Sequence, residues 1–420
     1  MEYLNAYTES IAISLIIIVS YFFNYISRKS KIPSVLLLIG LGVAIQYLLG
    51  KLEIRLDAFI MEALELLGVV GLIMIVLEAA LDLELRKDKK PILIKSFLVA
   101  FISLIGTTMV IAYILNEMIF QDFYKALIYA IPLSILSSAI IIPSVASLLD
   151  SKREFMIYES TFSDILGIMF FYFTLGGNEA SSTGKMALNI SGNIALTIVL
   201  SLILSYLMVL LLQKLESKIK LFFLISVLVL LYSTGKLFHL SSLLIIMVFG
   251  LVLNNYKIFF RGKLRGWINE TSMEHITEDF HVVTMETAFV VRTFFFVIFG
   301  MTLDFSNITD LPSIYISLAI LAVTYVIRFL LLKLFVRRNI TPQLWIAPRG
   351  LITVLLFFSI PASFLDDRFN PTILLIVILA TSIIMSIGLI AKKEDIEDTD
   401  ELVFNDWDEL DKEIEALEMK

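Results

Sequence analysis

Charged residues are excluded from long stretches of this chain, and each stretch has about the length of a membrane-spanning helix. A helix of about 20 apolar residues crosses a hydrocarbon core about 30 Å thick. The apolar segments run approximately over residues 8–26, 33–49, 61–81, 92–115, 125–149, 155–176, 189–213, 219–235, 237–254, 284–304, 312–336, 344–364 and 371–391. The pattern predicts an all-α polytopic membrane protein with about 13 transmembrane helices.

Basic residues alternate between the loops that join these segments. Loops after odd-numbered segments carry 20 Lys and Arg residues, whereas loops after even-numbered segments carry six. Because cytoplasmic loops are enriched in Lys and Arg, we expect the N-terminus outside and the C-terminus in the cytoplasm, in the cell (inner) membrane. Residues 1–10 contain no Lys or Arg, so we interpret the first segment as a transmembrane helix and not as a removable signal peptide.

The two halves of the chain share short features at matching places. Gly42 in segment two matches Gly250 in segment nine, and Asp82 after segment three matches Asp304 at the end of segment ten. Both pairs are seven segments apart, and an odd offset gives the two copies opposite orientations, as in inverted-repeat transporters. The expected units are a transmembrane domain over 1–391, with repeats over about 8–176 and about 219–391, and an acidic cytoplasmic tail over 392–420.

Two stretches depart from the apolar pattern. Residues 394–420 contain 13 acidic residues and two lysines, which favours a solvated acidic tail and leaves a regulatory or partner-binding role open. Residues 256–283 mix basic, aromatic and acidic side chains. We interpret them as an interfacial helix on the cytoplasmic side that precedes segment ten and links the two halves of the chain.

The amino-acid composition excludes several classes of protein and of functional site. Hydrophobic residues make up 58% of the chain and the mean hydropathy is +0.89, far above the values of a soluble domain. The chain has no cysteine, which excludes disulfides, thiolate metal sites and cysteine nucleophiles. The three histidines show no metal-ligand spacing. We expect a lipid bilayer as surroundings, no cofactor, no nucleic acid and no metal beyond a transported monovalent cation.

Asp164 is the first candidate functional residue, because an ionisable side chain inside a membrane helix costs several kcal/mol. It lies about nine residues into segment six, which at 1.5 Å per residue is about 14 Å and close to the membrane midplane. Burial disfavours the ionised carboxylate, so a proton and a cation can compete for it. Ser160 adds a hydroxyl on the same helix face. The alternative is a protonated structural aspartate.

Glu159 and Arg328 form the second candidate. Glu159 points away from Asp164 and needs a cation, and Arg328 lies about eight residues from the inner end of segment eleven, too deep for easy snorkelling. We expect a buried ion pair that fixes two helices together. The alternative is that Arg328 snorkels to the interface while Glu159 pairs with Lys152 or Arg153.

Segments five and twelve both contain residues that break helices. These broken-helix motifs comprise Ser137, Ser138 and Pro143 in segment five, and Pro348, Arg349 and Gly350 in segment twelve. Proline and glycine weaken a helix interior, and half-helix ends at midplane depth coordinate ions in transporters. Ordinary kinked helices also contain such residues, but the matching positions favour two broken helices that cross.

The motifs resemble those of the monovalent cation:proton antiporter superfamily, which includes bacterial sodium/proton antiporters and animal sodium/hydrogen exchangers. Residues 159–164 are similar to its Glu-Ser-x-x-Asn-Asp motif, and residues 295–304 to its Phe-Phe-x-x-x-Gly-Met-x-x-Asp stretch. Residues 348–350 resemble its Pro-Arg-Gly motif, and residues 78–82 its Gly-Leu-Glu signature. The resemblance covers about residues 8–391.

The resemblance implies a secondary transporter that exchanges Na⁺ or K⁺ for H⁺ by alternating access, with competitive binding at Asp164. It implies a homodimer in which a mobile core moves against a dimerisation domain, and it implies that Glu159 and Arg328 form the structural ion pair. The implied neighbouring ligands are Ser160 and Ser163, with Ser137 and Ser138 from segment five.

Two departures from the family pattern affect specificity. Ser163 replaces the asparagine before the aspartate, and Ser137-Ser138-Ala139 is closer to the potassium-efflux and plant-type branch than to the sodium exchangers. One carboxylate in place of two adjacent ones favours electroneutral exchange. A potassium efflux system or channel of the same fold remains the alternative, and a membrane-embedded enzyme is the least favoured because no catalytic constellation is present.

Overall fold

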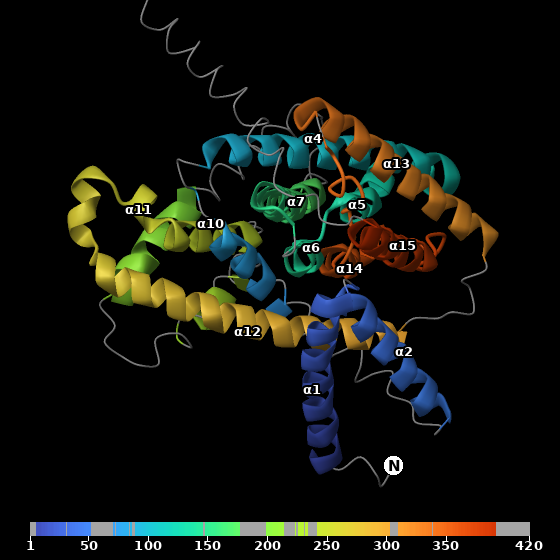
Figure 1. The fold of residues 1–420 in the computed structure, drawn as a ribbon, viewed down its shortest axis with the longest axis horizontal. Helices are drawn as coiled ribbons and strands as arrows, with labels where there is room; N and C mark the ends of the chain where they lie inside the picture. Colours follow the sequence, from blue (N-terminus) through green and yellow to red (C-terminus); the bar gives the residue numbers. More distant parts are fainter. Residues whose placement is uncertain are drawn as a thin grey trace, which may run out of the picture.

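The computed structural model describes residues 6–30, 32–51, 70–71, 73–83, 85, 89–145, 148–176, 199–213, 223, 226–230, 232–233, 242–302, 310–337 and 339–391. All regular structure in these ranges is helical (Figure 1), which confirms the predicted all-α class. The helices are α1 (Ala6–Ser30), α2 (Ser34–Lys51), α4 (Lys90–Leu115), α5 (Phe123–Ser134), α6 (Ser138–Ser144), α7 (Asp150–Gly176), α10 (Ser242–Asn254), α11 (Tyr256–Phe259), α12 (Glu270–Thr302), α13 (Leu311–Phe335), α14 (Leu351–Phe358) and α15 (Thr372–Ala391). Residues 73–82 and 199–213 are also helical.

Several helices are long and apolar enough to cross a membrane. Among the described residues there are seven such spans, and they lie in α1, α2, α4, α5 with α6, α12, α13 and α15. Side chains that are exposed on them are largely apolar, as expected for surfaces that face lipid and not water. The chain is therefore a multi-pass membrane protein.

The helices form two packed groups, which we call the core group and the outer group. The core group contains α4, α5, α6, α7, α13, α14 and α15, which pack on one another (Figure 1). The outer group contains α1, α2, residues 70–83, α10 and α12, with α12 packed along α2. The two groups meet where α10 contacts α7 and α1 contacts α6, so α7 lies at their boundary.

Glycines allow the closest approaches within the outer group. A Cβ on Gly42 of α2 would overlap the backbone of α12 at Val297, and a Cβ on Gly300 of α12 would overlap the backbone of α2 at Ile39. Gly250 of α10 packs in the same way on Ala80, where an added Cβ would come within 2.7 Å. The glycines that mark the expected repeats therefore both lie at helix–helix contacts.

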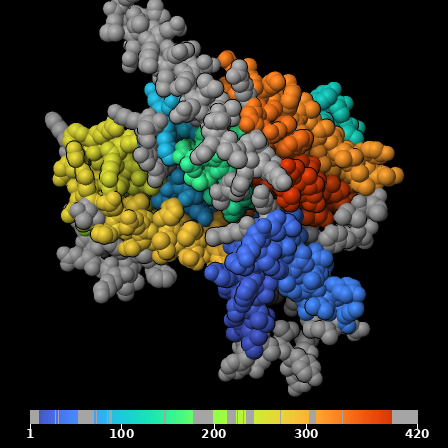
Figure 2. Space-filling view, in the orientation of Figure 1, coloured from blue at the N-terminus to red at the C-terminus, as the bar shows by residue number. Residues whose placement is uncertain are grey.

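The first helix extends away from the rest of the molecule. Figure 2 shows α1 projecting from the packed body together with α2. Only 6% of the apolar window of α1 is buried, and Ile11, Leu15, Ile18 and Phe22 are exposed. Such a surface requires lipid or another protein against it.

Two predicted boundaries are wrong. Residues 256–283 do not form a separate interfacial helix, because α12 runs without interruption from Glu270 to Thr302 and contains predicted segment ten. Its 33 residues span about 50 Å, longer than a hydrocarbon core, so one helix supplies both the polar start and the membrane span. Segment twelve is helical over only Leu351–Phe358, followed by a short 3₁₀ turn. Asp304 and the tail from residue 392 lie outside the described residues.

Candidate ion-binding site

Two unwound segments cross in the core group, one in each half of the chain. The first, residues 135–137, separates α5 from α6, and the second, residues 346–350, precedes α14. Pro348, Arg349 and Gly350 are buried in the second segment. Pro143 lies inside α6 and is exposed, so the first break precedes this proline instead of occurring at it.

Tertiary partners accept the hydrogen bonds that the first break releases. The N–H of Leu136 donates to Ser163 Oγ at 2.9 Å, and the N–H of Ser137 donates to the carbonyl of Pro348 at 3.0 Å. The N–H of Ser138 donates to Asp164 Oδ2 at 3.1 Å. Buried backbone groups that lose helical partners must find others. The break is therefore stabilised by α7 and by the second unwound segment.

Arg349 completes an exchange of hydrogen bonds between the two breaks. A continuous helix would bond the N–H of Ser137 to the carbonyl of Leu133, four residues earlier. That carbonyl instead accepts from Arg349 Nε at 2.7 Å. The buried guanidinium thus lies at the C-terminal end of α5, where a helix dipole favours positive charge. Its other hydrogen bonds reach neutral oxygens, those of Ala347 and Thr324.

Close packing at the crossing requires glycine. A Cβ on Gly350 would lie 2.5 Å from Ser137 Oγ and 2.9 Å from Ser137 Cβ. On α7, a Cβ on Gly167 would overlap the side chain of Ile135 in the first break. Both glycines therefore let the unwound segments approach their neighbours more closely than any other residue would allow.

Asp164 lies beside the crossing, near the middle of α7, and its carboxyl group is buried with only 1% of the residue exposed. α7 begins at Asp150, five residues before its predicted start, and the midpoint position of Asp164 is retained. Oδ2 accepts the N–H of Ser138, whereas Oδ1 is buried and has no hydrogen-bond partner among the described residues. The hydroxyl of Ser137 is likewise buried without a partner there.

The two serines of the α7 motif are occupied within the protein. Ser160 Oγ donates to the carbonyl of Ile157 at 3.1 Å, along its own helix. Ser163 Oγ accepts the N–H of Leu136. Ser163 therefore holds the unwound backbone beside Asp164, whereas Asp164 Oδ1 and Ser137 Oγ have no partner among the described residues. Thr353 Oγ1, on α14, is a further buried hydroxyl without a partner among the described residues.

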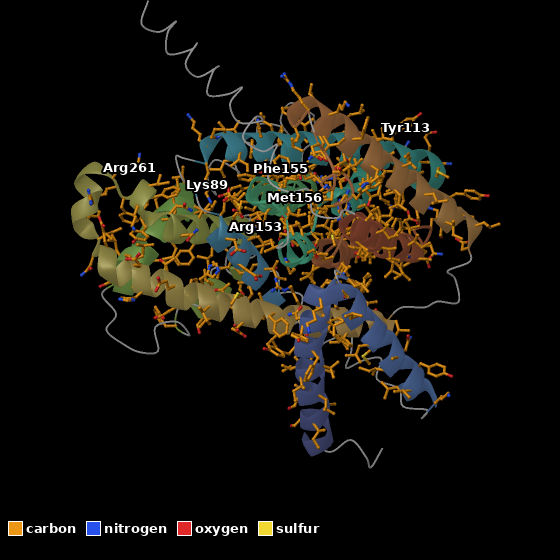
Figure 3. All side chains as sticks on the ribbon, viewed as in Figure 1. Lys89, Tyr113, Arg153, Phe155, Met156 and Arg261 are labelled. Atoms are coloured by element: carbon orange, nitrogen blue, oxygen red, sulfur yellow. The ribbon has the colours of Figure 1, made fainter. Side chains whose placement is uncertain are left out.

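The structure places Glu159 and Arg328 in direct contact. Arg328 donates from Nη1 to Glu159 Oε1 at 2.7 Å and from Nη2 to Oε2 at 3.1 Å, and both side chains are almost fully buried. Arg328 also donates from Nε to the carbonyl of Gln343 at 2.8 Å and lies 3.5 Å from the sulfur of Met156, one of the α7 residues labelled in Figure 3. The pair joins α7, α13 and the segment that leads into the second break.

Ion pairs fix the N-terminal end of α5. Asp366, in the loop before α15, accepts from Lys125 Nζ at 2.9 Å and from Arg368. The hydrogen bonds from Arg368, with a smaller contribution from Lys125, hold the pKa of Asp366 below its ordinary value. The start of α5 is thereby tied to the loop between α14 and α15.

A second charged cluster was not predicted from the sequence. Arg292 of α12 donates to Glu78 at 2.7 Å, and His281 Nε2 lies 3.4 Å from Asp82. The rule that identified Arg328, a charge deep inside an apolar segment, applies equally to Arg292. That signal was therefore visible in the sequence, but it did not identify Glu78 as the partner of Arg292.

Comparisons with known proteins agree with the fold. The family described as "sodium/hydrogen exchanger, transmembrane" matches residues 13–391. Among curated proteins, none matches the sequence. The fold is similar to a structure of the sodium proton antiporter MjNhaP1 from Methanocaldococcus jannaschii at pH 8, with a TM-score of 0.66, 19% identity and coverage of 90% of this chain and 94% of that chain. An electron-microscopy structure of the same antiporter gives a TM-score of 0.64 at 18% identity, covering 94% and 100%. Because the family match extends over most of its length, this chain belongs to the sodium/hydrogen exchanger family, whose members are antiporters and not enzymes.

Proposed function

We propose that the chain exchanges a monovalent cation, Na⁺ or K⁺, for H⁺ across the cell membrane, with Asp164 as the shared binding group. One observation carries the proposal: a buried carboxylate beside two crossing unwound segments has one oxygen bonded to a backbone N–H and the other unpartnered among the described residues. A buried polar atom without a partner is costly. A proton or a desolvated cation removes that cost, and only one of them fits at a time.

The remaining ligands are oxygens of the crossing. Ser137 Oγ is buried without a partner in the described structure, and Ser137 adjoins the residue whose N–H binds Asp164. Hydroxyl and carbonyl oxygens are the groups that replace water around an alkali cation. Ser138 supplies its backbone to the same carboxyl group. In this proposal Ser163 and Ser160 shape the site, because their hydroxyls already make hydrogen bonds to the protein.

Transport requires the site to open to each side in turn. We assign the movement to the boundary between the core group and the outer group, because α7 lies there with Asp164.

The exposed apolar face of α1 supports a homodimer with a second copy packed against it. The alternation of basic loops supports an outside N-terminus and a cytoplasmic C-terminus.

The first test is proton flux in proteoliposomes that contain the purified protein. Na⁺, K⁺ or Li⁺ is added to proteoliposomes that hold an imposed pH gradient. The cation that the protein transports should dissipate this gradient. Asp164→Asn should abolish this flux, because a neutral amide takes up no proton at neutral pH and offers the cation no negative charge to exchange for one, while the protein still inserts and elutes as the wild type does. Wild-type-like exchange by the variant would remove Asp164 from the mechanism.

The same assay separates the alternative function. The Ser137-Ser138 sequence favours a potassium efflux system or channel as the second candidate. A channel would conduct K⁺ without coupled proton movement and would persist without a pH gradient, whereas an antiporter couples the two fluxes. Cation-driven proton movement against a proton gradient would exclude the channel.

A further inference from the structure

A basic segment joins two apolar helices at the surface of the outer group. It covers residues 256–268, between the end of α10 at Asn254 and the start of α12 at Glu270, and contains α11 and a 3₁₀ turn over Gly262–Trp267. We call it the basic platform; it lies in the yellow surface at the left of Figure 2. Its charged residues are all basic, and they are Lys257, Arg261, Lys263 and Arg265.

The helix that ends at Gln213 holds the platform at two places. The hydroxyl of Tyr206 donates to the carbonyl of Phe259 at 3.0 Å. The side-chain amide of Gln213 donates to the carbonyl of Trp267 at 2.7 Å and accepts the N–H of Asn269 at 3.1 Å. These bonds satisfy backbone groups that no regular helix pairs. The platform is therefore a fixed support for the side chains that point outwards from it.

The same helix places the platform at the membrane surface. Every fourth residue on one of its faces is apolar and exposed, as expected for a face against lipid; these residues are Val199, Ile203, Leu207 and Leu211. The polar residues Gln213 and Lys214 follow that stripe. α10 is likewise apolar up to Asn254. Because the platform is bonded to the point at which these apolar helices end, it lies at the depth of the lipid headgroups.

The side chains of the platform suit that position. The indole of Trp267 is 60% exposed, and tryptophan is enriched at membrane–water interfaces because its ring is apolar and its N–H is polar. Arg261, at the edge of the molecule in Figure 3, is exposed, as is Lys257. Arg265 pairs with Glu270, whereas Arg261 and Lys257 have no acidic partner among the described residues. Two cations and an indole are thus available to a ligand.

We propose that the basic platform binds the headgroups of anionic phospholipids in the cytoplasmic leaflet. Arg261 and Lys257 contact the phosphate groups, and Trp267 lies among the headgroups beside them. A guanidinium group matches phosphate in shape and charge, and the expected cytoplasmic side is the one on which basic segments meet anionic lipid. The contact fixes the outer group in the bilayer, and it does not depend on which ion Asp164 carries.

The acidic tail over 394–420 is the other anion of this chain that a basic surface attracts. The exposed indole of Trp267 favours the bilayer, because an amphipathic ring gains most at the boundary between hydrocarbon and water. The tail is therefore treated as a competing outcome of the experiment.

Tryptophan fluorescence tests the proposal directly. The chain has three tryptophans, so Trp345→Phe/Trp407→Phe leaves Trp267 as the single emitter in the full-length protein. In phosphatidylcholine nanodiscs, brominated phosphatidylglycerol should quench this emission at a lower mole fraction than brominated phosphatidylcholine does. Arg261→Gln or Lys257→Gln should raise the phosphatidylglycerol fraction for half-maximal quenching about fivefold. Equal quenching by the two lipids, or no quenching, would overturn the proposal.

Lys333→Gln is the matched control. Lys333 is exposed near the C-terminal end of α13, in the core group, so the substitution removes the same charge away from the platform. It should leave half-maximal quenching unchanged. A shift as large as that of Arg261→Gln would show that net charge attracts the lipid, and would remove the platform as a site.

Thermal unfolding in detergent provides a measurement without tryptophan substitutions, in case they impair folding. Phosphatidylglycerol should raise the unfolding temperature of the wild-type protein, because a ligand of the folded state stabilises it, and should raise that of Arg261→Gln less. Glycerol phosphate, a soluble headgroup analogue, should not replace the lipid; equal stabilisation would assign a free phosphate site and overturn the proposal. Stabilisation by phosphatidylglycerol only after deletion of residues 394–420 would assign the platform to the acidic tail.

Discussion

Glu159 and Asp164 are both buried carboxylates on α7, but their surroundings differ. Glu159 accepts two hydrogen bonds from Arg328, and no side chain carries positive charge directly to Asp164 among the described residues. A carboxylate with a permanent cation remains ionised and structural. A carboxylate that has one backbone donor and a free oxygen can exchange ligands. We therefore propose that Glu159 serves stability and that Asp164 serves transport.

Neutralising either member of the Glu159–Arg328 pair should destabilise the protein. Glu159→Gln and Arg328→Gln each leave a buried charge without its partner, an effect of about 3–5 kcal/mol. The double variant should lose less than the sum, as a thermal-unfolding double-mutant cycle in detergent would show.

The exposed Arg265–Glu270 pair provides the control for this cycle, because it has the same chemistry and both side chains are at least half exposed. Exposed pairs contribute about 1 kcal/mol or less, so its variants should unfold near the wild-type temperature. Additive losses at Glu159 and Arg328 would contradict the assignment.

At the scale of elements, the site depends on two helices that stop short. The N–H groups of Leu136, Ser137 and Ser138 are satisfied by α7 and by the second break. In return, Arg349 of the second break donates a hydrogen bond to the carbonyl of Leu133. Each break stabilises the other, so neither half-helix pair is expected to keep its geometry alone.

Gly350→Ala should therefore impair transport more than the small size of the added methyl group suggests. The added methyl would meet Ser137 at 2.5–2.9 Å and would push the two breaks apart beside Asp164. We expect at least a tenfold loss of exchange rate, since displacements of about 1 Å at a site cost about that much or more, measured by cation-dependent proton flux.

Gly40→Ala is the matched control, because a Cβ at Gly40 of α2 would meet nothing within 4 Å. It should preserve both the rate and the thermal stability. Equal rates for the two variants would show that the close crossing is not needed for transport.

At the scale of the whole molecule, transport depends on which buried charges are already balanced by a partner. Glu159 is balanced by Arg328 and Glu78 by Arg292, Arg349 at the crossing contributes one positive charge that stays constant, and Ser163 has no charge. Arginine does not release its proton in proteins. In the proposed function, Asp164 is the group that alternates between one proton and one monovalent cation, so both loaded states have the same charge.

Exchange should therefore be electroneutral. A potassium-diffusion potential of either sign, imposed with valinomycin while sodium is the transported ion, should change neither the rate nor the final pH gradient. Movement of one net charge would instead contribute about 2.3 kcal/mol per 100 mV. A voltage-dependent final gradient would require a second group that titrates during the cycle.

The membrane class and the burial of Asp164, Glu159 and Arg328 within the core could be predicted from the sequence. A charge inside an apolar segment is visible without a structure because its cost in a membrane demands a reason. The approximate positions of the two breaks followed from their prolines, glycine and serines for a similar local reason. The family resemblance extended these predictions to an antiporter, and the family match confirmed it.

Only the tertiary structure decided which groups meet. The first break lies at residues 135–137, before Pro143, because Ser163, Pro348 and Asp164 accept the released N–H groups there. α12 is continuous from Glu270, because its polar first part still buries Met273, Ile276 and Phe280, with Phe280 packed against Phe249 of α10. Arg292 was visible as a buried charge, but its partner Glu78 is 214 residues away. Local sequence patterns report the cost of burying a group, whereas long-range packing determines which partner compensates that cost.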